Sequence, residues 1–404
     1  MAIDNPDPLA HDDFWDALEP LARIKAWAHA RGSAPAAVLT HSLLRAITVT
    51  PPNVVLPPIV GDVASLNLFA SFVANSGGGK NVSRKVARLA VRTPTPYVEL
   101  PVGSGEGIAR AYAYNETQNI DGHDVTELKW KARALMFRTD EVSGLAALAS
   151  RSGSTLGAAL KQGAMGEALG NAYADSTKAV IIPDHEYRMT YHVAVQPALS
   201  GAMFADQAGG FPQRFVWAQT VDPTIPLDAT HDPEPWFMHP RDWGTGQVVL
   251  DVPQQVWDIV STANRAKARG DYTELDGHAL LTQEKVAAGI MLLDNRTAIT
   301  WGDWLLAECV MRHSDIARQL CHDAMKAERL RRADEKGEAI ARTNDAVARS
   351  NYDRVLERVL EKTDADMTLT LSKLKQSFNS RDRDIVEVVV SDLREKGHIF
   401  PGMS

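Results

Sequence analysis

A glycine-rich segment in the first quarter of the chain has the residue types that bind phosphate. Three consecutive glycines precede Lys80, between the apolar run 66–73 and a predicted helix. Glycines let backbone N–H groups approach an anion, the lysine supplies a cation, and the start of the helix adds the positive end of its dipole. The residues predicted to hold a nucleotide phosphate chain are Ala74, Asn75, Ser76, Gly77, Gly78, Gly79, Lys80, Asn81 and Val82.

This segment resembles the P-loop pattern G-x-x-x-x-G-K-[ST], with two departures. Ala74 stands at the first glycine, and Asn81 stands where a serine or threonine hydroxyl usually binds Mg²⁺. The side-chain carbonyl of Asn81 would then have to replace that hydroxyl. The pattern predicts ATP and Mg²⁺ as ligands; the alternative is an ordinary glycine-rich turn before a helix.

An acidic pair follows a later apolar run, as a nucleotide site requires. Two residues separate Asp140 and Glu141 from the end of the predicted strand 132–137. Asp140 would hold the metal through water, and Glu141 would polarise the attacking water. Acidic pairs after apolar runs also form helix caps, so this pair gains its functional interpretation from the upstream glycine-rich segment.

Three further residues are candidates for contact with the γ-phosphate. Glu106 lies in a glycine-rich turn predicted over 101–108, where it is a second candidate base, a contact across a subunit boundary, or a solvated side chain. Gln196 ends a predicted strand, the position of a γ-phosphate sensor. Arg214 precedes another strand on a proline-containing turn. At this position it is either an arginine finger for a neighbouring subunit or a partner in a local salt bridge.

The elements that must position these residues are short apolar strands separated by helices. This alternation is typical of an α/β fold with a mostly parallel sheet that is covered on both faces. Helices are predicted over 13–48, interrupted near 32–35, and helix follows helix from 256 to about 314. The predicted strands lie at 66–73, 97–100, 132–137, 189–195 and 215–218.

The C-terminal part predicts one or two long charged helices followed by a small module. The charged stretch starts at Ile316 and has Gly337 as its weak point. Helices at 372–378 and 382–396, a C-cap at Gly397 and a short strand at 398–400 fit a winged helix-turn-helix. This module would bind DNA or another protein. The predicted divisions of the chain are 1–50, 51–254, 255–330, 331–363 and 364–404.

Composition and charge narrow the function classes further. The chain has 404 residues and a formal net charge of −8, which argues against a protein that coats nucleic acid electrostatically. Residues 312–404 are nearly balanced, with 18 Lys+Arg and 17 Asp+Glu, so any polyanion contact is expected there or on a few loops. The acidic, proline-broken N-terminus is unlike a signal peptide, and no apolar run is long enough for a membrane span. We therefore expect a cytoplasmic protein.

The order of these motifs resembles a known family of ATPase domains. A-x-x-x-G-G-K, G-S-G-E-G, T-D-E-x-S-G-L, V-Q-P and G-G-F-P-Q-R-F occur in the sequence as they do in P-loop ATPase domains that accompany primase-polymerases of actinobacterial phages and mobile elements. That group is akin to RecA-like and AAA+ replicative helicases, and the resemblance covers about residues 14–320. It implies ATP hydrolysis by Lys80, Asp140 and Glu141, with Arg214 acting in trans within a homo-oligomeric, hexameric ring.

The sequence favours two function classes. An ATPase that serves another cellular process is a third, less favoured class. The first is an ATP-driven DNA helicase or translocase of phage or mobile-element replication, which moves along single-stranded DNA in a channel and works with a primase or polymerase in the bacterial host cytoplasm. The second is a nucleotide-switched replication initiator or loader, favoured by Asn81, that binds duplex DNA through the winged helix. Candidates to line the channel are Lys129, Arg133, Lys161 and Lys178.

Overall fold

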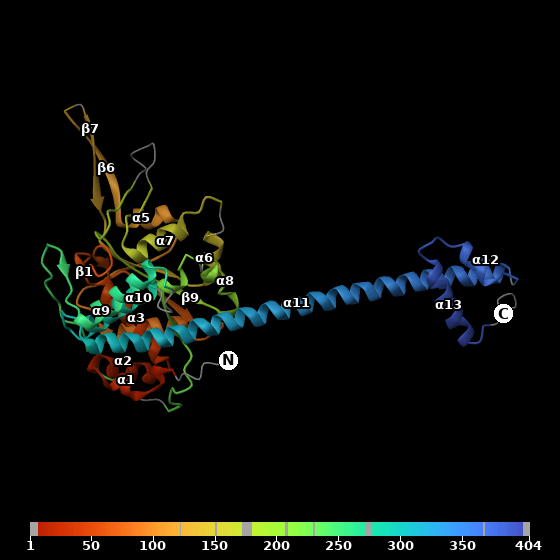
Figure 1. Ribbon diagram of the computed structural model, residues 1–404, viewed down its shortest axis with the longest axis horizontal. Helices are drawn as coiled ribbons and strands as arrows, with labels where there is room; N and C mark the ends of the chain where they lie inside the picture. Colours follow the sequence, from red (N-terminus) through yellow and green to blue (C-terminus); the bar gives the residue numbers. More distant parts are fainter. Residues whose placement is uncertain are drawn as a thin grey trace. The chain divides into compact units, whose positions relative to one another are not determined.

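The computed structural model shows a chain of two compact units, Met1–Lys326 and Ala327–Ser404. Figure 1 shows the arrangement of helices and strands within each of them. The structure describes residues 7–121, 123–149, 152–171, 180–206, 209–228, 231–271, 277–366 and 368–398.

A five-stranded, all-parallel sheet forms the centre of the first unit. Its strand order is β10-β3-β9-β8-β5, and every neighbouring pair is parallel. The strands coincide with the five predicted apolar runs, so the predicted α/β class and parallel sheet are confirmed. In sheet order they are β10 (Phe215–Gln219), β3 (Leu68–Val73), β9 (Arg188–Val195), β8 (Ala134–Thr139) and β5 (Val98–Pro101).

Helices cover both faces of this sheet because alternate strand residues point to opposite sides. On β3, Leu68 and Phe72 join one apolar cluster, whereas Phe69 and Val73 join another. The first cluster is completed by α2 (Glu19–Ala30), α3 (Pro35–Thr48), α4 (Lys80–Ala90) and α10 (Gly277–Leu293). The second is completed by α5 (Gly105–Tyr112), α6 (Val142–Ala149), α7 (Leu156–Met165) and α8 (Gly201–Phe204).

Because all five strands run in the same direction, the sheet has two chemically different ends. We call the end where the strands finish the carboxyl edge and the end where they begin the amino edge. The chain passes from β3 to the distant edge strand β5, returns inward through β8 and β9, and then crosses to β10 on the other side of β3. Strand order therefore reverses at β3, and ligands of such sheets bind outside the carboxyl ends of the strands at this switch point.

A long hairpin and several short elements complete the first unit. The hairpin consists of β6 (Ala113–Ile120) and β7 (His123–Trp130), which pair antiparallel with each other. Its mostly polar sequence lacks the apolar alternation that marks a half-buried strand, which is why no strand is predicted there. The short elements are α1 (Asp12–Asp16), β1 (Val54–Leu56), β2 (Ala64–Ser65), β4 (Val91–Arg92), β11 (Trp236–Phe237), β12 (Val248–Val249) and the 3₁₀ helices η1 (Pro8–Ala10), η2 (Pro197–Leu199) and η3 (Pro212–Arg214). The longer helix α9 (Gln254–Ala268) also belongs to this unit.

The second unit is helical in its described part. The charged stretch belongs to one helix, α11 (Trp301–Ala365), which Gly337 does not interrupt. The last part of α11 packs with α12 (Leu371–Gln376) and α13 (Arg383–Glu395) around a small core. Gly397 has a φ of 87° directly after α13, as a C-terminal cap requires. The wing strand predicted at 398–400 lies mostly outside the described residues, so the winged helix stays a prediction.

Within the described residues, no helix is both long and apolar enough to cross a membrane.

Candidate phosphate-binding site

The glycine-rich segment forms a tight loop at the carboxyl edge, between the end of β3 and the start of α4. The Ala74 N–H donates to the Val195 carbonyl at 3.1 Å, which ties the first loop residue to the neighbouring strand β9. Gly77 and Gly79 have φ values of 81° and 78°, a backbone region that only glycine adopts without strain. Helix α4 then begins at Lys80, with Gly79 as its N-cap. The loop therefore places the lysine at the N-terminus of a helix.

Ala74, the first departure from the P-loop pattern, makes Gly78 sterically necessary. A Cβ on residue 78 would lie 2.5 Å from the Cβ of Ala74 and 3.1 Å from the Asn75 carbonyl oxygen. Ala74 itself is buried. The loop thus tolerates alanine at its first position because residue 78 has no side chain.

Lys80 folds back over the loop. Its Nζ donates to the carbonyls of Ala74 at 2.8 Å and Asn75 at 3.2 Å. Burial lowers the pKa of Lys80, and the negative charge of Glu141 opposes this shift. The ammonium group therefore lies within electrostatic range of the predicted catalytic base and can exchange two loop carbonyls for phosphate oxygens.

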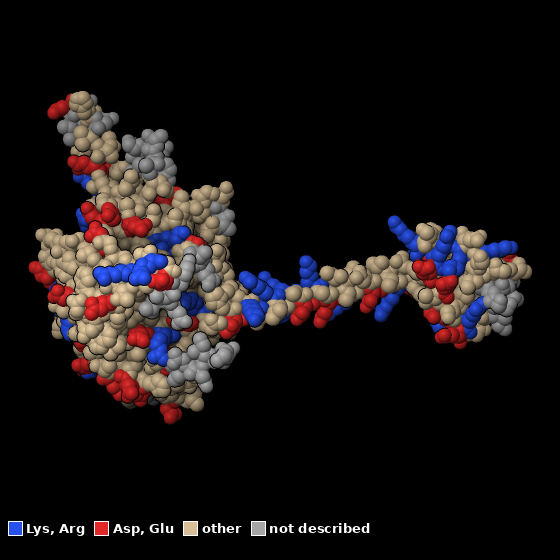
Figure 2. All heavy atoms as spheres, in the orientation of Figure 1, with Lys and Arg blue, Asp and Glu red and all other residues tan. Residues whose placement is uncertain are grey.

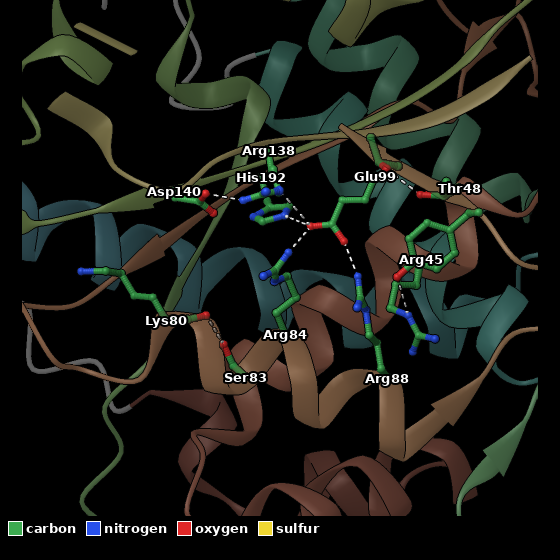
Figure 3. A network of polar contacts seen from close by, with 12 residues as sticks. Arg45, Thr48, Lys80, Ser83, Arg84, Arg88, Glu99, Arg138, Asp140 and His192 are labelled. Atoms are coloured by element: carbon green, nitrogen blue, oxygen red, sulfur yellow. Dashed lines mark hydrogen bonds and ion pairs between the residues drawn. The ribbon is translucent and has the colours of Figure 1, made fainter. Parts of the chain in front are cut away.

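The acidic pair lies at the same edge, directly after β8. Asp140 and Glu141 are both exposed. Asp140 Oδ2 accepts a hydrogen bond from Nη1 of Arg138, and Glu141 Oε2 accepts one from Ser143 Oγ at 3.3 Å. Figure 3 shows Lys80, Asp140 and Arg138 together with the polar network described below. The parallel sheet thus brings the lysine and the acidic pair to one edge, as predicted.

Gln196 joins this group because it directly follows β9, the strand between β3 and β8. Its carbonyl accepts a hydrogen bond from the Leu199 N–H at 2.9 Å, which starts the turn η2. The half-buried side chain of Gln196 therefore belongs to the same edge as Lys80 and Asp140. This placement matches the position predicted for a γ-phosphate sensor.

The loop prediction for Glu106 is wrong, because the residue lies in the first turn of α5. Ser104 caps this helix by accepting a hydrogen bond from the Gly107 N–H at 3.1 Å. Glu106 Oε1 accepts a hydrogen bond from Thr155 Oγ1 at 2.8 Å. Helix α5 follows β5, which is separated from β3 by two strands. The serine cap outweighs the glycines and fixes Glu106 away from the end of β3.

Arg214 lies at the amino edge, opposite the glycine-rich loop. It is the last residue of η3, which leads into β10, and its Nη1 donates to the Gly209 carbonyl at 2.7 Å. The length of the sheet separates it from Lys80 of its own chain. Any contact between Arg214 and a bound nucleotide would therefore require a second copy of the chain.

Thr220 is a loop anchor that sequence reasoning missed. It directly follows β10, and its N–H donates to the Val73 carbonyl at 3.1 Å. Its hydroxyl donates to the carbonyl of Gly78. The one signal in the sequence was a hydroxyl residue after an apolar strand, which is too common to be informative. Thr220 therefore holds the loop against β10, which pairs with β3 on the side opposite β9.

Glu99 is the second residue that the sequence did not reveal. It joins α4 to β8, the strand that precedes the acidic pair. Its carboxylate is paired with Arg84 and Arg88 of α4, and its Oε1 lies 3.3 Å from His192 Nε2 and 3.7 Å from Arg138 Nε. We call these five residues the Glu99 network (Figure 3). Burial raises the pKa of Glu99, but hydrogen bonds from His192 and Arg84 outweigh it and bring the pKa to about 2. The spacing of two arginines one helical turn apart was the available sequence signal.

Asn81 and Asp140 are the predicted metal ligands. Among the described residues, no group of three or more His, Cys, Asp or Glu side chains could hold a metal ion. Mg²⁺ in phosphate sites is usually held by one or two carboxylates together with substrate phosphates and water. Asn81 is exposed in the first turn of α4, and Asp140 keeps one oxygen besides the one bonded to Arg138. These two side chains therefore fit an ion that arrives with a nucleotide.

The described candidates for a basic channel are all paired with carboxylates. Lys129 Nζ lies 2.7 Å from a Glu127 oxygen, Arg133 Nη1 lies 3.0 Å from one of Glu186, and Lys161 Nζ lies 2.8 Å from one of Asp206. Lys178 lies outside the described residues. Figure 2 shows basic and acidic side chains interspersed on the visible surface of the first unit.

No protein-family model matches this chain, and no curated protein matches it.

Proposed function

We propose that this protein binds and hydrolyses ATP at the carboxyl edge of its central sheet. One observation carries the proposal: the topology brings the glycine-rich loop with Lys80, the acidic pair Asp140–Glu141 and Gln196 to the switch point of a parallel sheet. Phosphate chains bind at such helix N-termini because backbone N–H groups and the helix dipole both favour an anion.

Each residue then has a role that follows from its position. The loop N–H groups cradle the phosphate chain, and Lys80 leaves the carbonyls of Ala74 and Asn75 to neutralise charge on the terminal phosphates. Glu141 orients and deprotonates the attacking water, and Gln196 contacts the γ-phosphate. Bound Mg²⁺, held by Asn81 and Asp140, would supply further positive charge at the phosphate oxygens.

We propose further that hydrolysis drives movement along single-stranded DNA in a hexameric ring, in phage or mobile-element replication with a primase or polymerase partner. The position of Arg214 supports an assembly, because the arginine lies at the edge opposite its own loop. The resemblance of the motif order to replicative ATPase domains supports the choice of DNA.

The first experiment measures ATP hydrolysis with Mg²⁺, with and without single-stranded DNA. We expect stimulation by the strand in the wild type and a loss of at least about 100-fold in turnover for Lys80→Ala, because charge neutralisation in the transition state disappears. Lys85→Ala is the matched control, since Lys85 is exposed on the same helix. Equal turnover by wild type and Lys80→Ala would refute ATP hydrolysis at this site.

A mixing experiment tests the role of Arg214 in trans. Lys80→Ala and Arg214→Ala are each expected to be inactive alone. Their mixture should regain measurable turnover, because an interface can combine Lys80 from one variant with Arg214 from the other. A mixture as inactive as its components would remove Arg214 from the proposed mechanism.

A second candidate function is a nucleotide-dependent switch that binds duplex DNA through the C-terminal helices. Two observations favour it: Asn81 replaces the usual hydroxyl, and Asp140 is paired with Arg138. This function predicts ATP binding with little turnover, together with tight binding to one duplex sequence. Fluorescence anisotropy with labelled duplex and single-stranded DNA distinguishes it from the translocase, which prefers the single strand.

A further inference from the structure

The first unit contains a cavity that is separate from the proposed ATP site. It lies at the amino edge, between α9, α10, the segment 57–64 and residues around His185 that precede β9. Its volume is about 380 Å³, within the range of small-molecule sites. Most of its wall is aliphatic, with contributions from Ile59, Val63, Met165, Val260, Leu280 and Leu281.

A buried carboxyl group interrupts this aliphatic wall. Glu284 of α10 lines the cavity, although only 5% of its surface is exposed. Its carboxyl makes no hydrogen bond to another described residue. The neighbouring Lys285 directs its ammonium elsewhere, donating to the Ala164 carbonyl at 2.6 Å. A buried polar group without a partner costs free energy, so a ligand that supplies the partner would gain from binding here.

The charges around the cavity favour a cation. Asp62, Glu167 and Glu284 contribute carboxyl groups to the wall, whereas Lys267 is its one Lys or Arg among the described lining residues. These carboxyl groups would therefore repel an anionic ligand, such as a phosphate or a carboxylate. The described wall also contains no Phe, Tyr or Trp, the side chains that form the cages of quaternary ammonium ligands. A primary ammonium can donate hydrogen bonds to a carboxylate and needs no such cage.

We propose that this cavity binds a small primary alkylammonium, with its ammonium group on the Glu284 carboxylate and its alkyl chain against the aliphatic wall. The site is independent of the proposed ATPase activity, because the glycine-rich loop lies at the opposite edge of the sheet. Helices α9 and α10 and the segment 57–64 together supply most of its wall.

Isothermal titration calorimetry of the full chain tests the proposal with three probes of equal length. Hexylammonium should bind. Its neutral analogue 1-hexanol and its anionic analogue hexanoate should bind at least about tenfold more weakly, since neither can form an ion pair with a carboxylate. No heat from hexylammonium, or equal affinity for 1-hexanol, would overturn the proposal.

Two variants test separately the charge of Glu284 and the volume of the cavity. Glu284→Gln keeps the shape of the side chain and should weaken hexylammonium binding at least about tenfold at pH 8, while leaving 1-hexanol unchanged. Ala263→Leu fills the cavity from α9 and should abolish binding of both probes. Both variants are checked by circular dichroism and thermal unfolding. Unchanged hexylammonium affinity in folded Glu284→Gln would contradict the assigned contact.

The affinity should also depend on pH. Burial raises the pKa of Glu284 to about 8, so its carboxylic acid must lose a proton before it can pair with the ammonium. Affinity should therefore rise about tenfold from pH 6 to pH 7, in proportion to the deprotonated fraction. Protonation of Lys285, whose pKa burial lowers to about 7, acts in the same direction. The other charged or titratable groups of the described wall are Asp62, Glu167, His185, Lys267 and His278.

Glu284→Gln isolates the contribution of the carboxyl to this dependence, since it should flatten the rise between pH 6 and pH 7. An unchanged slope in the variant would assign the effect to other groups that face the cavity and overturn the role of Glu284. Lys80→Ala serves as the reference for the ATP site, and it should bind hexylammonium as the wild type does.

Discussion

The two edges of the central sheet use charged residues in opposite ways. At the carboxyl edge, Asp140 and Glu141 are exposed and Lys80 is only half-buried. At the amino edge, Arg188 and Lys285 are both buried. Arg188 donates to the carbonyls of Thr50, Pro51 and Val54 and to the side chains of Ser65 and Asn67.

This difference shows that a charged side chain next to a strand has no fixed meaning. A buried guanidinium must satisfy its donors within the protein, and Arg188 does so with backbone and side-chain oxygens. The half-buried Lys80 at a helix N-terminus instead keeps weak contacts that a ligand can replace. Substitutions at the two edges should therefore separate stability from ligand binding.

The largest effect on stability is expected for Arg188→Met. Loss of the guanidinium removes a donor from three backbone carbonyls, of which those of Thr50 and Val54 are buried, and this should lower the free energy of unfolding by about 3–5 kcal/mol. Urea unfolding followed by tryptophan fluorescence measures this, because all nine tryptophans lie between Trp15 and Trp304, within the first unit. Arg23→Met, on the surface of α2, is the control and should cost less than about 1 kcal/mol. Equal losses in the two variants would remove the contrast between the edges.

The second effect is a pH-dependent loss in Glu99→Gln. Because the folded pKa of Glu99 is about 2, below its ordinary value, the carboxylate stabilises the fold above about pH 5. This stabilisation is lost as the pH falls from about 5 to 2. The variant should be less stable by about 2 kcal/mol at pH 7, and the difference should shrink toward pH 2. A difference that is constant with pH would mean that the charge of Glu99 contributes nothing.

A smaller effect is expected for Thr220→Val, which removes the hydroxyl that donates to the Gly78 carbonyl. One lost hydrogen bond should cost about 1 kcal/mol of unfolding free energy. ATP affinity should fall more noticeably, because the glycine-rich loop loses an anchor. Binding of a fluorescent ATP analogue, compared with Thr224→Val on the exposed turn, measures this. If affinity is unchanged, the loop holds its shape without Thr220.

The smallest effect on stability is expected for Lys80→Ala. Among the described residues, its ammonium donates to the carbonyls of Ala74 and Asn75, which water can also satisfy, so the free energy of unfolding should change by less than about 1 kcal/mol. The same substitution should weaken ATP binding at least about tenfold, since a phosphate contact is lost. A large loss of stability instead would make Lys80 a structural residue, like those of the amino edge.

The local elements of this protein follow from its sequence. The five apolar runs become the five strands of the sheet. The charged stretch around Gly337, for which the sequence allows one helix or two, lies within one helix. The glycine-rich segment is recognisable because its conformation depends on consecutive residues. Periodicity and glycine content act over a few residues, so they can be read without a fold.

Residues that act through distant partners could not be identified this way. Nothing in the sequence around Glu99 shows that it meets Arg84 and Arg138, and nothing around Thr220 shows that it holds Gly78. Glu106 was misplaced because a serine cap and a partner on another segment, Thr155, decide its position.

The sequence by itself determined the five strands of the central sheet, most of the helices and the loop that ends in Lys80. The tertiary structure decided the strand order, and with it which charges reach the carboxyl edge and which are buried at the amino edge. The reason is physical: hydrogen bonds within a helix or turn join neighbours in the chain, whereas strand pairing and burial join residues that are far apart in it.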